Sequence, residues 1–285
     1  MTHVTGVPRT NEEKVTGPGG LGIFVRSWQP AAGTRGVVVI CHGVNSHSGY
    51  FVWAAEQLAS NGLAVYALDL QGRGQSDGER FYLEKISDYV HDVHAVVSLA
   101  KSRNAGLPVL LLGHSAGGVV SCVYALEHQA DLAGLICESF AFQVAAPDFA
   151  LAVVKGLSHL APHAHVLRLK NEDFSRDPAV VRAMNADPLI ANEVQPTRTV
   201  AELVRADERL AREFPLITLP VLILHGTADK VTNPKGSQLF YDTAGSQDKT
   251  LKLYDGHVHD LLNDVGREQV MADIQTWIAA RIVRA

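Results

Sequence analysis

The stretch VLLLGHSAGGVVSCVYALEH, residues 109–128, begins as an unbroken apolar run and continues with a helical pattern. Ser115 stands at the junction, with Gly113, Gly117 and Gly118 close to it. A G-x-S-x-G pattern between a strand and a helix is typical of a tight turn that lifts the serine hydroxyl above a sheet. The N-terminus of the following helix would direct N–H groups toward an oxyanion formed there. The stretch therefore predicts a nucleophilic serine, and the alternative is a glycine-rich turn with an incidental serine.

The rest of the chain predicts the fold around this turn. Short apolar runs typical of strands buried on both faces alternate with helical patterns, which indicates an α/β fold with a mostly parallel central sheet flanked by helices. The run at 250–256 alternates and is expected nearer an edge. The expected buried strands are 36–43, 63–70, 108–115, 132–139 and 220–226, and the expected helices are 51–62, 86–103, 118–129 and 269–282.

The alternation stops between about residues 140 and 215, where the chain is helical or irregular and no strand is expected. Open α/β sheets bind their ligands at the carboxyl ends of the strands. We therefore predict an α/β core made of residues 1–139 and 216–285, with a helical cap, or lid, formed by residues 140–215.

Composition excludes several classes of function. Hydrophobic residues make up 47% of the 285 residues, enough for a large core, and the net charge is −5. Without a basic run, nucleic acid is a poor partner. The odd number of cysteines (Cys41, Cys122 and Cys137) argues against a disulfide framework. No signal-peptide pattern or bilayer-length apolar stretch is present, so a cytoplasmic protein is expected.

A serine hydroxyl needs an oriented base to become a nucleophile, and in hydrolases of this architecture the acid and the histidine follow the serine in that order. Asp229 comes just after the strand at 220–226, and His257 and His259 follow the strand at 250–256. The residues alone do not decide between the two histidines. No Cys or carboxylate cluster completes a metal site around them. Less well placed acids are Asp242, Asp248 and Asp255.

The loop after the first core strand, CHGVNSHSGYF at 41–51, is expected to supply one oxyanion donor. The paired candidates are the backbone N–H groups of Val44 and Ala116. His42 and His47 are expected to shape this loop by hydrogen bonding. A metal role is not expected for His163 and His165 in the cap, and Asp77 disrupts the dinucleotide-binding pattern begun by GRG at 72–74.

From about residue 20 onward the chain resembles the monoacylglycerol lipase branch of the α/β-hydrolases. The motifs that carry this resemblance are HGVNSHSGYF, ALDLQGRGQSDGER, LGHSAGGVV, FSRDPAVVRAMNADPL, VLILHGTADKVTNPKGS and LKLYDGHVHDLLND. It implies a catalytic triad of Ser115, Asp229 and His259, since Gly256-His257-Val258-His259 matches the family's Gly-x-x-His, and an oxyanion hole at Val44 and Ala116.

The resemblance also implies hydrolysis of a small-molecule ester without metal or cofactor, most simply a monoacylglycerol, with transient contact between the cap and a membrane surface. The chain departs from the family at Ser46, where an acidic residue is common, and at Ala116, where methionine is common. Open alternatives are a carboxylesterase for short or aromatic esters, a lysophospholipase, a cofactor-free perhydrolase and a noncatalytic binding protein.

Overall fold

The computed structural model describes residues 7–142 and 148–282. Its centre is an eight-stranded sheet in the order β1-β2-β4-β3-β5-β6-β9-β10. The strands β1 and β2 are antiparallel to their neighbours, and all other pairings are parallel. The strands are β1 (Arg9–Thr16), β2 (Gly22–Gln29), β3 (Gly36–Cys41), β4 (Leu63–Leu68), β5 (Val109–His114), β6 (Gly134–Glu138), β9 (Val221–Gly226) and β10 (Lys249–Tyr254).

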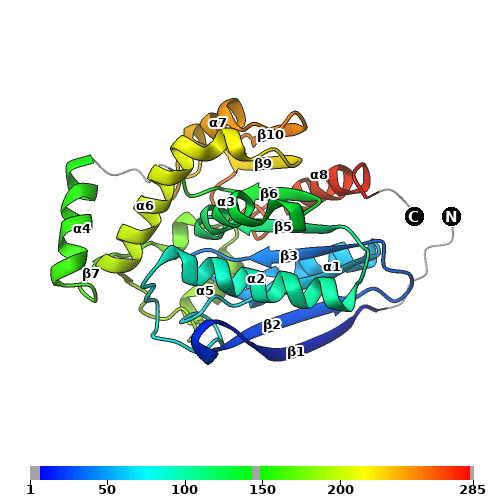
Figure 1. Ribbon diagram of the computed structural model, residues 1–285, viewed down its shortest axis with the longest axis horizontal. Helices are drawn as coiled ribbons and strands as arrows, with labels where there is room; N and C mark the ends of the chain where they lie inside the picture. Colours follow the sequence, from blue (N-terminus) through cyan, green and yellow to red (C-terminus); the bar gives the residue numbers. More distant parts are fainter. Residues whose placement is uncertain (1–6, 143–147, 283–285) are drawn as a thin grey trace.

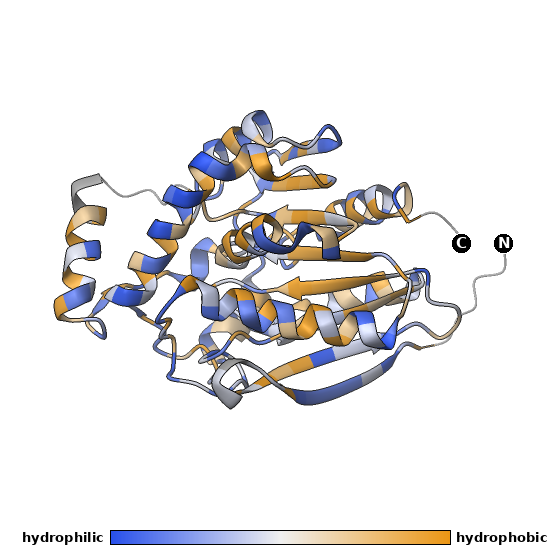
Figure 2. Cartoon of the chain, in the orientation of Figure 1, coloured by the Kyte–Doolittle hydropathy of each residue, from blue (hydrophilic) through white to orange (hydrophobic). Residues whose placement is uncertain are grey.

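The mostly parallel sheet predicted from the apolar runs is confirmed, and β10 lies at an edge as its alternation indicated. All residues of β3, β4, β5, β6 and β9 are buried, because helices cover both faces. The prediction omitted β1 and β2. The first of these is polar and exposed over most of its length, so it carries little apolar signal. Figure 2 shows this contrast between the hydrophilic β1 and the apolar central strands.

Helices α2, α3 and α7 pack on one face of the sheet, and helices α1 and α8 pack on the other (Figure 1). Each face has its own apolar cluster, so the sheet is buried between two helical layers. The bounds are α1 (Val52–Ser60), α2 (Ile86–Arg103), α3 (Ala116–His128), α7 (Pro234–Thr243) and α8 (Arg267–Ala279).

Between β6 and β9 the chain forms an inserted segment, a name used here for residues 148–215. Figure 1 shows α4 and β7 beyond the carboxyl ends of the parallel strands. The expectation of no strand was wrong here, because β7 and β8 pair as a short antiparallel ladder. They are too short for a periodic signal. The elements are α4 (Asp148–Leu160), β7 (His165–Leu167), α5 (Pro178–Ala186), β8 (Gln195–Pro196) and α6 (Thr197–Glu213).

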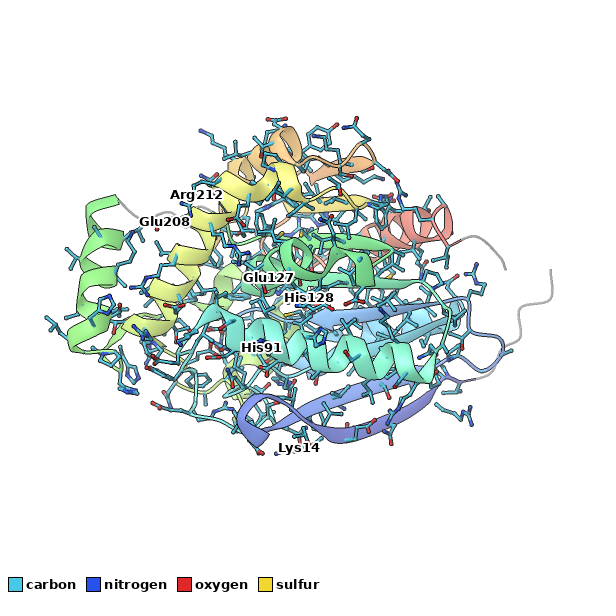
Figure 3. All side chains as sticks on the ribbon, viewed as in Figure 1. Lys14, His91, Glu127, His128, Glu208 and Arg212 are labelled. Atoms are coloured by element: carbon cyan, nitrogen blue, oxygen red, sulfur yellow. The ribbon has the colours of Figure 1, made fainter. Side chains whose placement is uncertain are left out.

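Ion pairs connect the inserted segment internally and to the core. Lys155 of α4 pairs with Glu208 of α6, and Arg209 of α6 donates to Glu127 of α3 at 2.6 Å. Figure 3 shows Glu208 on α6 and Glu127 at the end of α3. In the described part of the chain, no helix is both long and apolar enough to cross a membrane.

Asp92 of α2 predicts a pH-dependent stability. Burial raises the pKa of Asp92 to about 7, although the hydrogen bond that its carboxylate accepts from the Gln71 N–H acts to lower it. Between about pH 4 and about pH 7 the folded state therefore binds a proton that the unfolded state has lost. The contribution of the protonated Asp92 to the free energy of unfolding disappears as pH rises through this range. Asparagine at position 92 does not titrate, so only the wild type should lose stability as pH rises. The unfolding free energy of Asp92→Asn minus that of the wild type should therefore be larger at pH 8 than at pH 5, by on the order of 3 kcal/mol. Urea denaturation at both pH values measures this, and a pH-independent difference would contradict it.

Candidate active site

Ser115 lies between β5 and α3 in a strained backbone conformation, with φ 54° and ψ −122°. Its N–H donates to the Glu138 carbonyl at 2.9 Å, and its carbonyl accepts from the Gly118 N–H at 2.9 Å. A non-glycine residue at positive φ costs free energy, and such strain is found at functional sites. The turn expected from the G-x-S-x-G pattern is present.

Gly117 is required by close backbone packing in this turn. A Cβ at this position would lie 2.3 Å from the Cys41 carbonyl oxygen and 2.4 Å from that of His42. Because both obstacles are backbone, Gly117→Ala should destabilise the fold by about 3 kcal/mol or more and displace the serine turn.

Gly156 of α4 provides the control, since a Cβ there meets no atom within 4 Å. Gly156→Ala should stabilise the protein by up to about 1 kcal/mol. Thermal unfolding of both variants checks the pair. Equal unfolding temperatures for the two would show that the turn has more room than its geometry indicates.

Asp229 and His259 meet at the carboxyl ends of β9 and β10. The His259 Nδ1 is 2.8 Å from the Asp229 Oδ2, and both side chains are fully buried. Burial by itself raises the pKa of Asp229, but the adjacent His259 and the hydrogen bonds from His225, His259 and Thr232 hold that pKa well below its usual range. The carboxylate is therefore ionised and can accept a hydrogen bond from an imidazole N–H. The His259 Nε2 has no hydrogen-bond partner among residues 7–142 and 148–282.

Two residues that sequence reasoning missed complete the surroundings of Asp229. The His225 Nε2 lies 3.0 Å from the Asp229 Oδ2, and its Nδ1 lies 2.7 Å from the Ser237 Oγ. Thr232 Oγ1 donates to the same Oδ2 at 2.8 Å. An ionised carboxylate only accepts, so both histidines present an N–H to it. The one available signal was a histidine in the otherwise apolar run of β9.

The two histidines that follow β10 have different partners. The His257 Nδ1 lies 3.9 Å from the Asp264 Oδ2, whereas the His259 Nδ1 lies 2.8 Å from the Asp229 Oδ2. The rival acid Asp255 is exposed and accepts from the Thr227 hydroxyl at 3.1 Å.

Ser115, Val44 and Ala116 line one cavity of about 70 Å³. The backbone N–H groups of Val44 and Ala116 have no hydrogen-bond acceptor among the described residues. Thr232 lines the same cavity and connects it to the acid, because its hydroxyl is 2.8 Å from Asp229 Oδ2 and 3.4 Å from His259 Nδ1. The ring of His114 lies 5.0 Å from that of His259.

The walls of this cavity are largely apolar and come mainly from the inserted segment. An apolar cavity beside a candidate nucleophile and two free amide donors suits a substrate with an acyl chain. The lining residues from the inserted segment are Leu151, Leu167, Leu169, Gln195, Val200, Leu203 and Val204.

Of the other histidines in the sequence prediction, His42, His47 and His163 form side-chain contacts with other parts of the protein. His42 Nδ1 donates to the Gly43 carbonyl at 2.6 Å and its Nε2 accepts from the Leu70 N–H at 3.0 Å, while burial lowers its pKa to about 4. His47 lies 2.8 Å from Asp187 of the inserted segment. His163 contacts Glu79 at 2.8 Å, and His165 lies exposed in β7.

Two groups of side chains within the described residues could hold a metal ion, and neither contains Ser115, Asp229 or His259. The first joins His94, His128 and Asp131, and the second joins His114, Glu138 and Asp260. Neither group is part of the candidate site. That the chemistry of this site uses no metal ion remains a prediction.

Comparisons with known proteins identify the family. The sequence pattern of the family described as "Serine aminopeptidase, S33" matches residues 32–266. The chain is 32% identical to the monoacylglycerol lipase of Mycolicibacterium smegmatis, covering 95% of this chain and 98% of that protein. It is 33% identical to the human monoglyceride lipase, covering 92% of this chain and 88% of that protein.

A solved structure resembles the whole arrangement. The crystal structure of the Paleococcus ferrophilus monoacylglycerol lipase superimposes with a TM-score of 0.82 at 27% identity, covering 91% of this chain and 99% of that one. Sheet order, serine turn and relatives all point to the same group of carboxylic ester hydrolases. The chain belongs to the α/β-hydrolase family, as a serine hydrolase of the monoacylglycerol lipase type.

Proposed function

We propose that the protein hydrolyses monoacylglycerols through an acyl-enzyme on Ser115. The observation that carries this proposal is the apolar cavity bordered at once by Ser115, Val44 and Ala116. A strained serine turn beside free amide donors is suited to attack on a carbonyl carbon, because the developing oxyanion meets donors that are already in place.

In this proposal, His259 accepts the proton of Ser115 as the hydroxyl attacks the ester carbonyl. Asp229 holds the imidazole with its Nδ1–H toward the carboxylate and stabilises the imidazolium that forms. The 2.8 Å contact between the His259 Nδ1 and the Asp229 Oδ2 supports these roles. His259 then protonates the departing alcohol and activates the water that releases the fatty acid.

The amides of Val44 and Ala116 are proposed as the oxyanion hole. Ala116 is the first residue of α3, so its N–H also benefits from the positive end of the helix. The side chain at 116 does not enter this role, since the backbone donates. The departure from methionine therefore leaves the reaction intact.

We further propose that residues 140–215 act as the cap over the site and that residues 1–139 and 216–285 form the core. The apolar lining of the cavity by the inserted segment supports this division. Of the cap residues, 143–147 lie outside the described chain. The same proposal includes a cytoplasmic location, which is supported by the three buried free cysteines.

Contact of the cap with a lipid surface is part of the proposal. On α4, Val153 is 63% exposed and Leu160 is 87% exposed. Exposed apolar side chains on a lipase cap favour transient contact with the surface that presents the substrate. Replacing both with serine should reduce co-sedimentation with phosphatidylcholine vesicles without changing hydrolysis of a dispersed short-chain ester, and unchanged sedimentation would contradict the contact.

The small volume of the cavity keeps a second candidate function open, a carboxylesterase for short-chain esters. Sites for drug-sized ligands occupy roughly 300–1,000 Å³, whereas this cavity measures about 70 Å³. The test is kcat/KM for monoacylglycerols and for ethyl esters of the same acids, across chain lengths from acetyl to palmitoyl. Monoacylglycerol hydrolysis predicts a preference for the glycerol ester at medium or long chain length. Equal rates for both alcohols, with an optimum at acetyl or butyryl, would favour the carboxylesterase.

A further inference from the structure

The loop that carries Val44, residues 42–50, is held by polar side chains of the inserted segment. The N–H of Asn45 donates to the Glu193 Oε1 at 3.0 Å. The side-chain amide of Asn45 donates to the Asn171 Oδ1 at 3.0 Å. Farther along, His47 and Tyr50 both contact the Asp187 Oδ2, at 2.8 Å and 2.9 Å. Three residues of the inserted segment therefore contact one loop of the core.

The contact with Glu193 differs from the other two, because it engages the backbone of the loop beside Val44. Asn45 has a φ of 49°, in the left-handed region that non-glycine residues rarely adopt. A backbone in this region persists only where its surroundings hold it. The hydrogen bond from the Asn45 N–H fixes the peptide that joins Val44 to Asn45, and so limits the rotations that would turn the Val44 N–H away from the cavity.

Glu193 is itself held in place by buried partners. Its side chain is 1% exposed, and its Oε1 also accepts from the Gln195 Nε2 at 2.7 Å and from Arg73. Arg73 is 2% exposed and donates to the Tyr89 hydroxyl at 2.9 Å and to the Gln195 Oε1 at 2.8 Å. A carboxylate with a buried guanidinium partner in this network is a fixed acceptor rather than a mobile surface group.

We propose that Glu193 is a positioning residue for the oxyanion hole: through the Asn45 amide it holds the Val44 N–H toward the reacting carbonyl. The inserted segment then does more than line the acyl cavity, since it supplies the group that completes the catalytic geometry of the core. The proposal rests on the proposed function of the Val44 amide. It concerns a group that acts through another and does not touch the substrate.

The experiment compares two double variants that leave no unpaired buried charge. Both replace Arg73 with glutamine, and Glu193 becomes glutamine in one and leucine in the other. Glutamine at 193 keeps an acceptor oxygen for the Asn45 N–H, whereas leucine removes it. A further control, Glu84→Gln, weakens the contact of Glu84 with Arg198 of α6, which joins the inserted segment to the core without touching the loop.

The first readout needs no catalysis. Hydrogen–deuterium exchange of peptides covering residues 42–50 should be at least several-fold faster in the Arg73→Gln/Glu193→Leu variant than in its glutamine counterpart, because the Asn45 amide has lost its acceptor. Glu84→Gln should leave exchange of this loop at the wild-type rate. Equal exchange in the two double variants would overturn the proposal, whether or not the protein hydrolyses the ester tested.

The second readout is the division between kcat and KM. A displaced donor acts in the transition state, so the leucine variant should lose roughly 10²-fold in kcat relative to the glutamine variant while KM stays within about three-fold. Affinity for a boronic acid that forms a tetrahedral adduct on the serine should fall in parallel. Faster exchange with an unchanged kcat would also overturn the proposal. If the wild-type protein shows no more esterase activity than Ser115→Ala, the proposed function is refuted instead. The exchange measurement would still test whether Glu193 holds the loop through the Asn45 N–H.

Discussion

Replacing Ser115 with alanine is expected to lower kcat for ester hydrolysis by on the order of 10⁵-fold or more, with little change in the unfolding temperature. The hydroxyl is the atom that forms the acyl-enzyme, so no other group can take over the covalent step. Alanine keeps the small side chain that the turn at φ 54° accommodates. The residual rate would come from the oxyanion donors and the bound substrate. Steady-state kinetics on the preferred ester measures the loss.

Ser139 offers a matched control for this variant. It also follows a buried strand, β6, and it has a positive φ of 46°. Its N–H donates to the Leu224 carbonyl, and among the described residues it forms no hydrogen bond with His259. Ser139→Ala should therefore keep the activity and the labelling of the wild type. Intact-protein and peptide mass spectrometry after treatment with a fluorophosphonate checks the assignment. A label on any residue other than Ser115 would refute the proposed nucleophile.

The central sheet could be predicted because a strand buried on both faces is an apolar run, and β3, β4, β5, β6 and β9 all have this pattern. The antiparallel strand β1 was not predicted, because it is stabilised by pairing with β2 and not by apolar residues of its own. In the inserted segment, the β7–β8 ladder depends on contacts between residues about thirty positions apart. Such pairings leave no local period.

The contact between Asp229 and His259 could be predicted from the order of the residues along the chain. Both follow strands of the sheet, and the carboxyl ends of parallel strands meet at one edge. Sequence reasoning could not find His225, Thr232 and Glu193 as parts of the site. Each acts through a hydrogen bond set by tertiary packing: His225 and Thr232 contact the Asp229 carboxylate, and Glu193 contacts a loop 148 positions away. Their residue types alone are equally compatible with ordinary buried polar groups.

Replacing Asp229 with asparagine should lower kcat by on the order of 10⁴-fold. Both carboxylate oxygens only accept hydrogen bonds: Oδ1 from the N–H groups of Val231 and Thr232, at 2.7 Å and 3.0 Å, and Oδ2 from His259, His225 and the Thr232 hydroxyl. An asparagine NH₂ in either place faces donors. With the NH₂ at the Oδ2 position, His259 is driven to the tautomer whose Nδ1 accepts, and its Nε2–H can no longer take the proton of the serine.

The loss on Asp229→Asn should persist at high pH, because it arises from the wrong imidazole tautomer and not from a proton that base could remove. Asp255→Asn is the matched control, since the same chemical change at an exposed carboxylate outside the site should leave kcat within about two-fold of the wild type. Kinetics from pH 6 to pH 10, with unfolding temperatures for both variants, separates a catalytic defect from a folding defect. An Asp229→Asn protein that is folded and retains more than about a tenth of the wild-type kcat would contradict the role of the carboxylate in orienting His259.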